Sequence, residues 1–477
     1  MAKRKRATVA ELEAKLMAAQ MQLSQSERRR RWEAAKVSRR TENWYTTADG
    51  PNTDLRTVWR RLVARHRDLI DNNPWADRAV KVKTNSAIGD GVMGTPRNGS
   101  RRYGEAYQEW AESTDCDWHG RLNFYGLQSL IYRTVSASGS CLVRRRLDAD
   151  AAARGLIPLR LEVLEPDWLD MDKDDGRTIQ FGQQFSDAGR LEGYWLRREH
   201  PGERGWNGLR TDPEFVPASE ILLIYDTRRP GQRLGVPDGA SVIISLRDID
   251  DIQQAQLLKT KIASCFTAFV YDSEAPDQVA TTAAELTDTL EPGAIEILPP
   301  GKQITFANPP SSGDFTTDMR HYLHAVAAGY SITYEALTGI LNDVNFSSGR
   351  MGWIEAYREV ARLRWNVIVP QLLTPVGRWF NEAAAMVTMR GPRQMIWTFP
   401  RRELIDPAKE ITALIEAVGA GIMSLSEVQR SLGYVPAEVI TELGQDKAAA
   451  EAAGLQLAVF SGVSSTGSAQ QSNQSSP

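Results

Sequence analysis

Two stretches decide the fold of this chain: residues 240–270, which read ASVIISLRDIDDIQQAQLLKTKIASCFTAFV, and residues 315–337, which read FTTDMRHYLHAVAAGYSITYEAL. In both, apolar residues recur at intervals of three and four, as they do along one buried face of a helix. These residues are Ile249, Ile252, Ala255, Leu258, Ile262, Phe266 and Phe269, then Phe315, Met319, Tyr322, Val326 and Tyr330. A helix of about 30 residues is about 45 Å long, which suits a strut that crosses a large assembly. The sequence therefore predicts two long helices.

The segment between them, residues 272–312, breaks the helical pattern. Residues 295–298 and 303–306 flank the turn signal Pro299-Pro300-Gly301, which predicts a strand, a turn and a second strand. After the second helix, residues 339–349 are expected to form a polar loop. A third long helix is expected to begin near Ser348, because serine is a favourable N-cap residue.

The sequence on either side predicts a mixed architecture. Residues 54–90 predict helices that separate at Asn73-Pro74, because the residue before proline avoids the helical conformation. Trp59, Leu62, Val63, His66 and Leu69 are expected on one face of the first helix. Short β-rich runs follow, bounded by Gly, Pro and Asp, at 140–146, 159–164, 179–185, 193–197 and 221–225. Beyond the third helix, which Pro370 is expected to bend or restart, small helices are expected at 406–419, 424–432 and 448–455. The fold class is therefore α+β.

The composition is that of an ordinary globular protein. The 477 residues are 42% hydrophobic and 25% charged, with a formal net charge of −3, which argues against tight wrapping of duplex DNA. The three cysteines are too widely spaced for a disulfide framework or a zinc cluster. We expect no transmembrane helix, since no run of about 18 apolar residues occurs, and no secretory signal, since no apolar segment follows the basic N-terminus.

The acidic clusters are the strongest candidates for catalysis, and we interpret them as solvated surface. Asp248, Asp250 and Asp251 lie within one helical turn and point in different directions, so they cannot converge on a metal pair alone. The run from Asp170 to Asp175 lacks the glutamate that closes a calcium loop, and we read it as an acidic turn. Neither a phosphate-binding Walker A loop nor a Gly-x-Ser-x-Gly elbow occurs in the sequence. We therefore expect neither an enzyme nor a metal or cofactor site.

Several blocks of sequence, taken in order, resemble the lambda-type family of tailed-bacteriophage portal proteins. The most specific block is AVAAGYSITYEALTG at 325–339, followed by NFSSGR at 345–350. Earlier blocks that resemble the family are NNPWA at 72–76, GDGV at 89–92, LEPDWL at 164–169, VPA at 216–218 and the run from Arg228 to Pro237. The resemblance covers roughly residues 54–455.

This resemblance implies a portal-protein fold with a wing, a long-helix stem, a small β-containing clip and a helical crown. The implied parts are a charged, partly disordered N-terminal arm (1–53), the wing (54–239), the first stem helix (240–271), the clip (272–312), the second stem helix (313–338), the tunnel loop (339–349), a long wing helix with a return segment (350–405), the crown (406–455) and a disordered tail (456–477).

The resemblance also implies a function: a homo-oligomeric ring, usually of twelve subunits, through which double-stranded DNA enters and leaves the capsid. The expected partners are the large terminase, a head-completion or adaptor protein, and the major capsid or scaffold protein, at the capsid vertex of the virion and, during assembly, in the host cytoplasm. The residues expected near DNA are Asn342, Asn345, Phe346, Ser347, Ser348 and Arg350. Those expected to bind partners at the clip are Glu296, Pro299, Pro300 and Lys302.

Three other classes of protein predict different features of the sequence. A nuclease or recombinase predicts acids or a nucleophile gathered in a cleft. A different capsid or tail protein predicts mainly β structure, against the three long helices. A regulatory protein that binds DNA through the basic segment from Lys3 to Arg6 is disfavoured, because that segment is a small part of the chain.

Overall fold

The computed structural model describes residues 13–18, 20–21, 39, 42–43, 45–97, 101–203, 212–264, 268–272, 302–306, 315–342, 345–389, 391, 394–400, 404 and 406–455. The chain divides into two compact units, Met1–Asp54 and Leu55–Pro477. In the first unit, residues 13–18 are helical and Tyr45 is 90% exposed.

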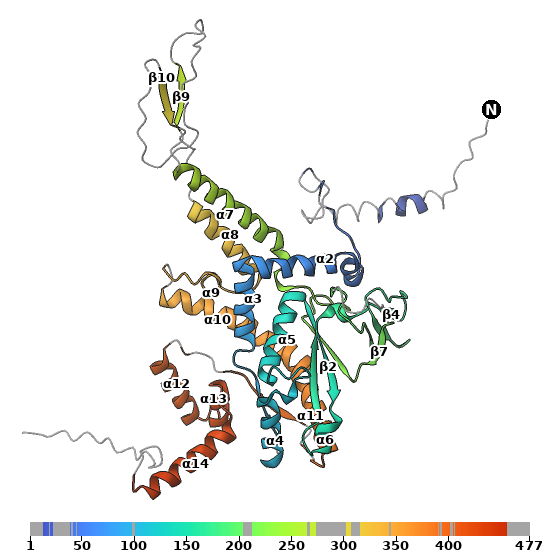
Figure 1. The fold of residues 1–477 in the computed structure, drawn as a ribbon, viewed down its shortest axis with the longest axis vertical. Helices are drawn as coiled ribbons and strands as arrows, with labels where there is room; N and C mark the ends of the chain where they lie inside the picture. Colours follow the sequence, from blue (N-terminus) through green and yellow to red (C-terminus); the bar gives the residue numbers. More distant parts are fainter. Residues whose placement is uncertain are drawn as a thin grey trace, which may run out of the picture. The chain divides into compact units, whose positions relative to one another are not determined.

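Helices form most of the second unit (Figure 1). The longer ones are α2 (Pro51–Asn72), α3 (Pro74–Ala87), α4 (Arg101–Glu112), α5 (Phe124–Ser138), α7 (Ile243–Ser264), α8 (Phe315–Gly329), α10 (Phe346–Leu363), α11 (Thr374–Met386), α12 (Pro407–Gly419) and α14 (Pro436–Ala452). The shorter ones are α6 (Ala149–Ala153), α9 (Tyr334–Thr338) and α13 (Leu425–Ser431). No described helix is both long and apolar enough to cross a membrane.

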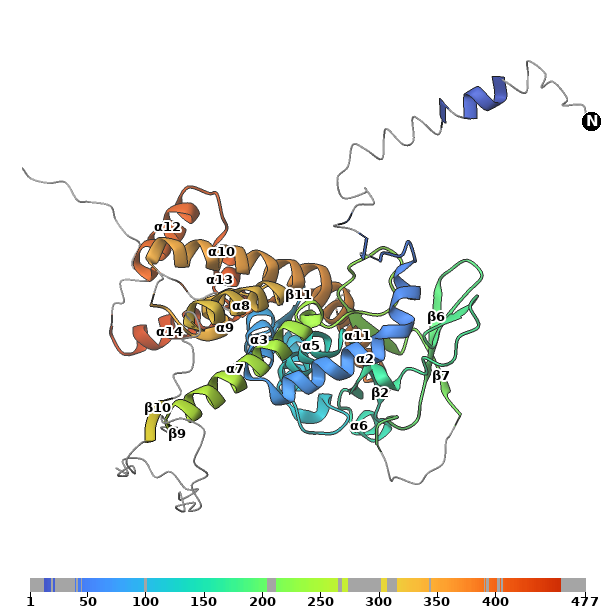
Figure 2. The same cartoon turned by 90° about the horizontal axis from the view of Figure 1, so that it is seen from above.

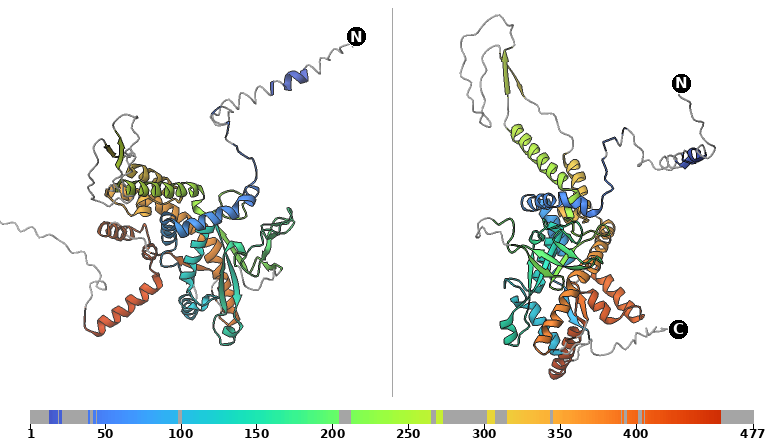
Figure 3. Two further views of the ribbon diagram at one scale, coloured as in Figure 1. Left: turned by 45° about the horizontal axis from the view of Figure 1, so that its top comes forward. Right: turned by 90° about the vertical axis from the view of Figure 1, so that its right-hand side faces the viewer.

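The strands form four small antiparallel sheets. Three strands pair in the order β3-β2-β8, namely Leu159–Leu164, Ser140–Leu147 and Ile221–Tyr225, and this sheet lies beside the helices in Figure 3. Four others pair in the order β4-β5-β6-β7, namely Ile179–Gln180, Gln183–Phe185, Leu191–Leu196 and Glu214–Pro217. The two remaining pairs are β1 with β11, Met93–Pro96 with Met395–Thr398, and β9 with β10, Ala268–Asp272 with Lys302–Phe306.

Three buried clusters hold these elements together. The largest joins α3, α4, α5 and the sheet β3-β2-β8 to the helical stretch from Leu363 to Ala384, in which Phe380 is fully buried. A second cluster packs α7 and α8 against α2 and α3, so the two helices lie side by side, as Figures 1 and 2 show from two directions. The third packs α2 against the two larger sheets.

The predicted helix pair is confirmed over most of its length, with two corrections. The first helix ends at Ser264, and residues expected at its end form β9 instead, because Phe269, Val270 and Tyr271 favour a strand when a partner is available. The second helix ends at Gly329, and α9 is a separate short helix. A predicted strand at 303–306 is confirmed as β10, but its partner is β9, and residues 295–298 lie outside the described residues.

Other expected elements differ in their bounds. The run 179–185 is two strands, β4 and β5, separated by Phe181 and Gly182, both of which have positive φ. The last expected helix, 448–455, is the end of a longer helix, α14. β1, β7 and β11 were not predicted, since each has only four residues.

Pro370 lies inside the third helix without breaking it. Residues Arg364–Leu373 form a π-helical segment between α10 and α11, with Pro370 inside it. Proline lacks an N–H group and its ring clashes with the carbonyl four residues earlier, so a wider helical turn accommodates it. The backbone N–H of Thr374 accordingly bonds to the carbonyl of Val369, five residues back.

Candidate functional site

A buried polar joint fixes the inner ends of α7 and α8 to the rest of the unit. His66 of α2 and Tyr330, directly after α8, are both fully buried. The His66 Nδ1 atom lies 2.7 Å from the carbonyl oxygen of Ala137, and its Nε2 atom lies 2.7 Å from the Tyr330 hydroxyl. Because a carbonyl only accepts, Nδ1 carries the proton and donates to it, and Nε2 accepts from the tyrosine hydroxyl. A neutral imidazole therefore has a hydrogen-bond partner at both ring nitrogens.

An ion pair lies next to these two rings. Asp238, in the turn before α7, accepts a hydrogen bond from Ser136 Oγ at 2.7 Å and pairs with Lys83 Nζ at 3.0 Å. Burial lowers the pKa of His66, and the charge of Asp238 opposes that shift only in part. Burial also raises the pKa of Tyr330. The joint thus draws one polar side chain from each of five elements and keeps both rings uncharged near neutral pH.

Two glycines let the backbones approach at this joint. A Cβ atom on Gly239 would lie 2.2 Å from the Tyr330 hydroxyl and 2.6 Å from His66 Nε2. A Cβ atom on Gly329 would lie 2.4 Å from a methyl group of Val242. Larger residues at either place would force the start of α7 away from the end of α8.

The chain reverses direction immediately after the joint. Ile332 N–H bonds to the carbonyl of Ala327, and Ser331 N–H to that of Ala328, which is the Schellman pattern that ends a helix. Ser331 takes the left-handed conformation, with φ of 57°, where glycine is usual. The Thr333 hydroxyl then caps α9 by accepting from Ala336 N–H. The joint therefore fixes where α9 and the loop after it begin.

The residues expected near DNA lie partly in that loop and partly in the first turns of α10. Asn342 lies in the loop itself, which also exposes Ile340 by 48% and Leu341 by 65%. Asn345 precedes α10, and its carbonyl accepts from Gly349 N–H. Phe346, Ser347 and Ser348 form the first turn of α10, so the expected loop is shorter than 339–349 and the helix begins two residues before Ser348.

Arg350 stands in the first turns of α10 with an exposed side chain. Its charge contributes to the lowered pKa of Asp406, after the larger contributions from Lys409. Of the residues expected at the clip, Lys302 is the first residue of β10, opposite Asp272. Glu296, Pro299 and Pro300 lie outside the described residues.

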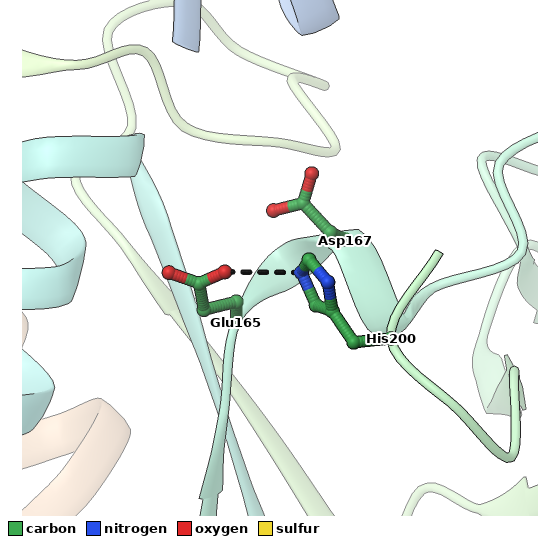
Figure 4. Close-up of side chains that lie close together, drawn as sticks. All are labelled: Glu165, Asp167 and His200. Atoms are coloured by element: carbon green, nitrogen blue, oxygen red, sulfur yellow. Dashed lines mark ion pairs between the residues drawn. The ribbon is translucent and has the colours of Figure 1, made fainter. Parts of the chain in front are cut away.

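One group of side chains has the composition of a metal site. Glu165, Asp167 and His200 place ligand atoms within 4.8 Å of one another, and Figure 4 shows His200 beside Glu165. Arg67 already occupies this group, with its Nη2 atom 2.6 Å from Asp167 and 3.4 Å from Glu165. A guanidinium in that position repels a cation, so we interpret the group as an ion-paired cluster.

Most of the acidic residues singled out from the sequence are bound to protein groups, whereas Asp248 is exposed. Asp250 accepts from the Asn73 side chain at 2.8 Å, and Asp251 lies 3.9 Å from Arg247. In the acidic run, Asp175 accepts from the backbone of the turn that follows it, whereas Asp172 and Asp174 pair with arginines of α2. The reading as an acidic turn is confirmed.

The sequence matches a known protein family and two phage proteins. The family described as "Phage portal protein, lambda family" matches residues 37–364. A probable portal protein of Halomonas phage phiHAP-1 is 22% identical over 453 residues, which cover 87% of this chain and 86% of the relative. The portal protein of Escherichia phage N15 is 20% identical over 493 residues, covering 90% and 92%.

A solved structure shares the fold. A chain in the neck of an empty gene transfer agent particle, computed with C6 symmetry, gives a TM-score of 0.50 at 16% identity and covers 80% of this chain and 95% of its own length. The architecture is therefore that of a structural component of phage-like particles. The chain belongs to the lambda family of phage portal proteins, which are not enzymes.

The joint was missed from the sequence. His66 and Tyr330 were each placed on an apolar helix face, but nothing paired them across the 264 residues that separate them. The available signal was a polar ring atom on each of two otherwise apolar faces, since such atoms need a partner when buried.

Proposed function

We propose that this chain forms a closed ring of twelve copies at the capsid vertex, with a central channel for double-stranded DNA during packaging and ejection. The observation that carries the proposal is the helix pair α7 and α8, anchored at one end by the His66–Tyr330 joint and connected at the other through the β9–β10 pair. Head-to-tail contacts that close by rotation produce such rings.

Within this ring, we assign the parts of the chain by function. The helix pair is the stem, β9 and β10 belong to the clip, and α12 to α14 form the crown. Residues 54–239, with the third long helix, form the wing. The clip contacts the large terminase during packaging and the head-completion protein afterwards, and the wing contacts the major capsid or scaffold protein.

The loop after α9 is the part that we place in the channel. Asn342, Asn345 and Arg350 are exposed and can contact phosphates, while Ile340 and Leu341 offer no charge. Each phosphate neutralised by a cation releases counterions and strengthens binding, so a conduit needs few such contacts. The loop sequence has amide and apolar residues and one acidic residue, Asp343, and a single arginine follows it, which meets that need.

Electron microscopy of the recombinant protein tests the ring. Negatively stained particles of the full chain are expected to be closed rings of about twelve subunits with a central channel. Monomers or open filaments at every salt concentration would contradict the proposal. Metal-dependent cleavage of plasmid DNA by the same preparation would favour a nuclease instead.

A further inference from the structure

A basic pocket lies away from the loop and the joint, between the π-helical segment, α11, β11 and α13. Its volume is about 680 Å³, within the range of about 300–1,000 Å³ typical of ligand sites. Four arginines line it, Arg97, Arg364, Arg378 and Arg430, with Glu427 as the one carboxylate among the described lining residues. The described lining therefore carries an excess of positive charge.

Arg364 is the innermost of these arginines, only 8% exposed. Its Nε and Nη2 atoms donate to the carbonyls of Ala87 and Ser86, at 2.8 and 2.9 Å, at the end of α3. Its guanidinium also lies over the Phe399 ring, 4.8 Å from the centroid. No described carboxylate pairs with it. A side-chain hydrogen bond with Tyr357 opposes in part the lowering of its pKa by burial. Its positive charge still has no counter-ion among the described residues, so it favours an anionic partner.

The pocket also holds an unsatisfied hydroxyl group. Thr398 of β11 is 2% exposed and lines the pocket, and its hydroxyl is buried without a hydrogen-bond partner. Such groups are rare in native structures, because each costs the free energy of its lost hydration. The remaining wall is aromatic: Trp365, Trp397 and Phe399 line it, and Trp365 is 59% exposed.

We propose that this pocket binds an acidic peptide segment of a partner protein, with carboxylates against the arginines and an apolar side chain against the aromatic wall. Arginine pairs bidentately with carboxylates, and aromatic side chains are enriched at the core of protein interfaces. Duplex DNA fits less well, because its rigid backbone can reach only the exposed arginines at the rim. The site is separate from the DNA conduit and does not depend on it.

A labelled peptide tests the site directly. The probe is a fluorescein-labelled peptide in which Asp and Glu alternate with Leu and Phe, and the control is the same peptide with Asn and Gln. Fluorescence anisotropy with the full-length protein is expected to show saturable binding of the acidic peptide alone. Arg378→Ala with Arg430→Ala should weaken it at least tenfold, since each arginine supplies a charge-assisted bond.

A matched pair of variants distinguishes binding in the pocket from a non-specific effect of positive surface charge. Arg61→Ala with Arg65→Ala removes two exposed arginines of α2 that have no ion pair among the described residues, and binding should stay within twofold of wild type. Thermal unfolding of each variant checks that the fold is intact. Failure of the acidic peptide to bind, or equal loss in both double variants, overturns the proposal.

Two competing ligands test whether the pocket binds something other than a peptide. A 20-base-pair duplex that displaces the peptide, and that itself loses affinity through Arg378→Ala with Arg430→Ala, would make this a DNA site. Complete displacement by millimolar inorganic phosphate would reduce it to a general anion site. Either result contradicts a peptide site, while ring formation, measured separately, is unaffected by all of these outcomes.

Discussion

At residue 239 the backbone has no room for a side chain. A Cβ there would contact the Tyr330 hydroxyl at 2.2 Å and His66 at 2.6 Å. Gly239→Ala is expected to destabilise the fold by about 1–3 kcal/mol, as overpacking of a buried site does. Urea unfolding measures it. Gly419→Ala is the control, because nothing lies within 4 Å of a Cβ at that position. Equal stability of the two variants would show that the joint yields without cost.

His66 gives the fold a dependence on pH. Its pKa in the folded chain lies below the value of 6.5 of the free side chain, so the unfolded chain binds more protons in the interval between the two. Stability is therefore complete above about pH 6.5 and falls as the pH drops toward the folded pKa, by at most about 1.4 kcal/mol per pH unit.

Urea unfolding at pH 7.5 and 5.5 measures this dependence. His66→Gln should lose this part of the pH dependence, since glutamine does not titrate, whereas the exposed His119→Gln should keep it. An unchanged pH dependence in His66→Gln would assign it to other groups.

The apolar faces of the helices could be predicted residue by residue, but not the polar contacts between them. Trp59, Leu62, Val63, His66 and Leu69 were expected on one face of α2, and all are buried except Leu62, which is half-buried. Burial follows from spacing within one helix. The partner of His66 depends on how α2 packs against the end of α8, which local spacing does not encode.

At the scale of elements, the break between α8 and α9 rests on Ser331. Its left-handed φ of 57° is unfavourable for any residue with a Cβ. Ser331→Gly should therefore stabilise the fold by about 0.5–1 kcal/mol, and Ser331→Val should destabilise it. Amide hydrogen exchange over residues 331–338 and urea unfolding report both changes. If glycine destabilised the turn, the helix end would depend on the serine side chain and not on backbone conformation.

The break between α8 and α9 also shows why the apolar spacing predicted one helix where the structure has two. The apolar spacing from Phe315 to Tyr330 continues with Ile332, Tyr334 and Leu337, and it predicts one helix. The Schellman turn at Ala327 to Ile332 contains no glycine at its left-handed position, so the usual signal for a helix end is missing. β9 was mistaken for helix for a related reason: Phe269 continued a helical spacing while also favouring a strand.

At the scale of the whole molecule, the loop after α9 should matter for DNA and not for assembly. Deleting residues 340–342 is expected to leave rings intact, because those residues are exposed, and to impair packaging or retention of DNA. Particle yield and packaged DNA, with electron microscopy of the rings, measure the two effects. Deleting 187–189, an equally exposed turn between β5 and β6, is the control. Normal DNA content after the first deletion would refute the channel assignment.

The long-range strand pairing beside the largest buried cluster could not be predicted from the sequence. β1 pairs with β11 across about 300 residues, and the pairing leaves no local signature in strands of four residues. The helix pair and the β excursion were predictable because each depends on neighbouring sequence. The loop residues were predicted through the resemblance of two short blocks, and their bounds shifted when α10 began at Phe346.

The largest buried cluster combines two parts of the chain that are far apart in the sequence, which has a consequence for synthesis on the ribosome. Val143 and Phe124 are made early, but Leu363, Phe380 and Trp397, which cover them, emerge only after the helix pair between them has been translated. At roughly 5–20 residues per second, that interval is on the order of ten to forty seconds. During this time the nascent chain exposes an apolar face, so chaperone occupancy should peak there and end once the last strand emerges.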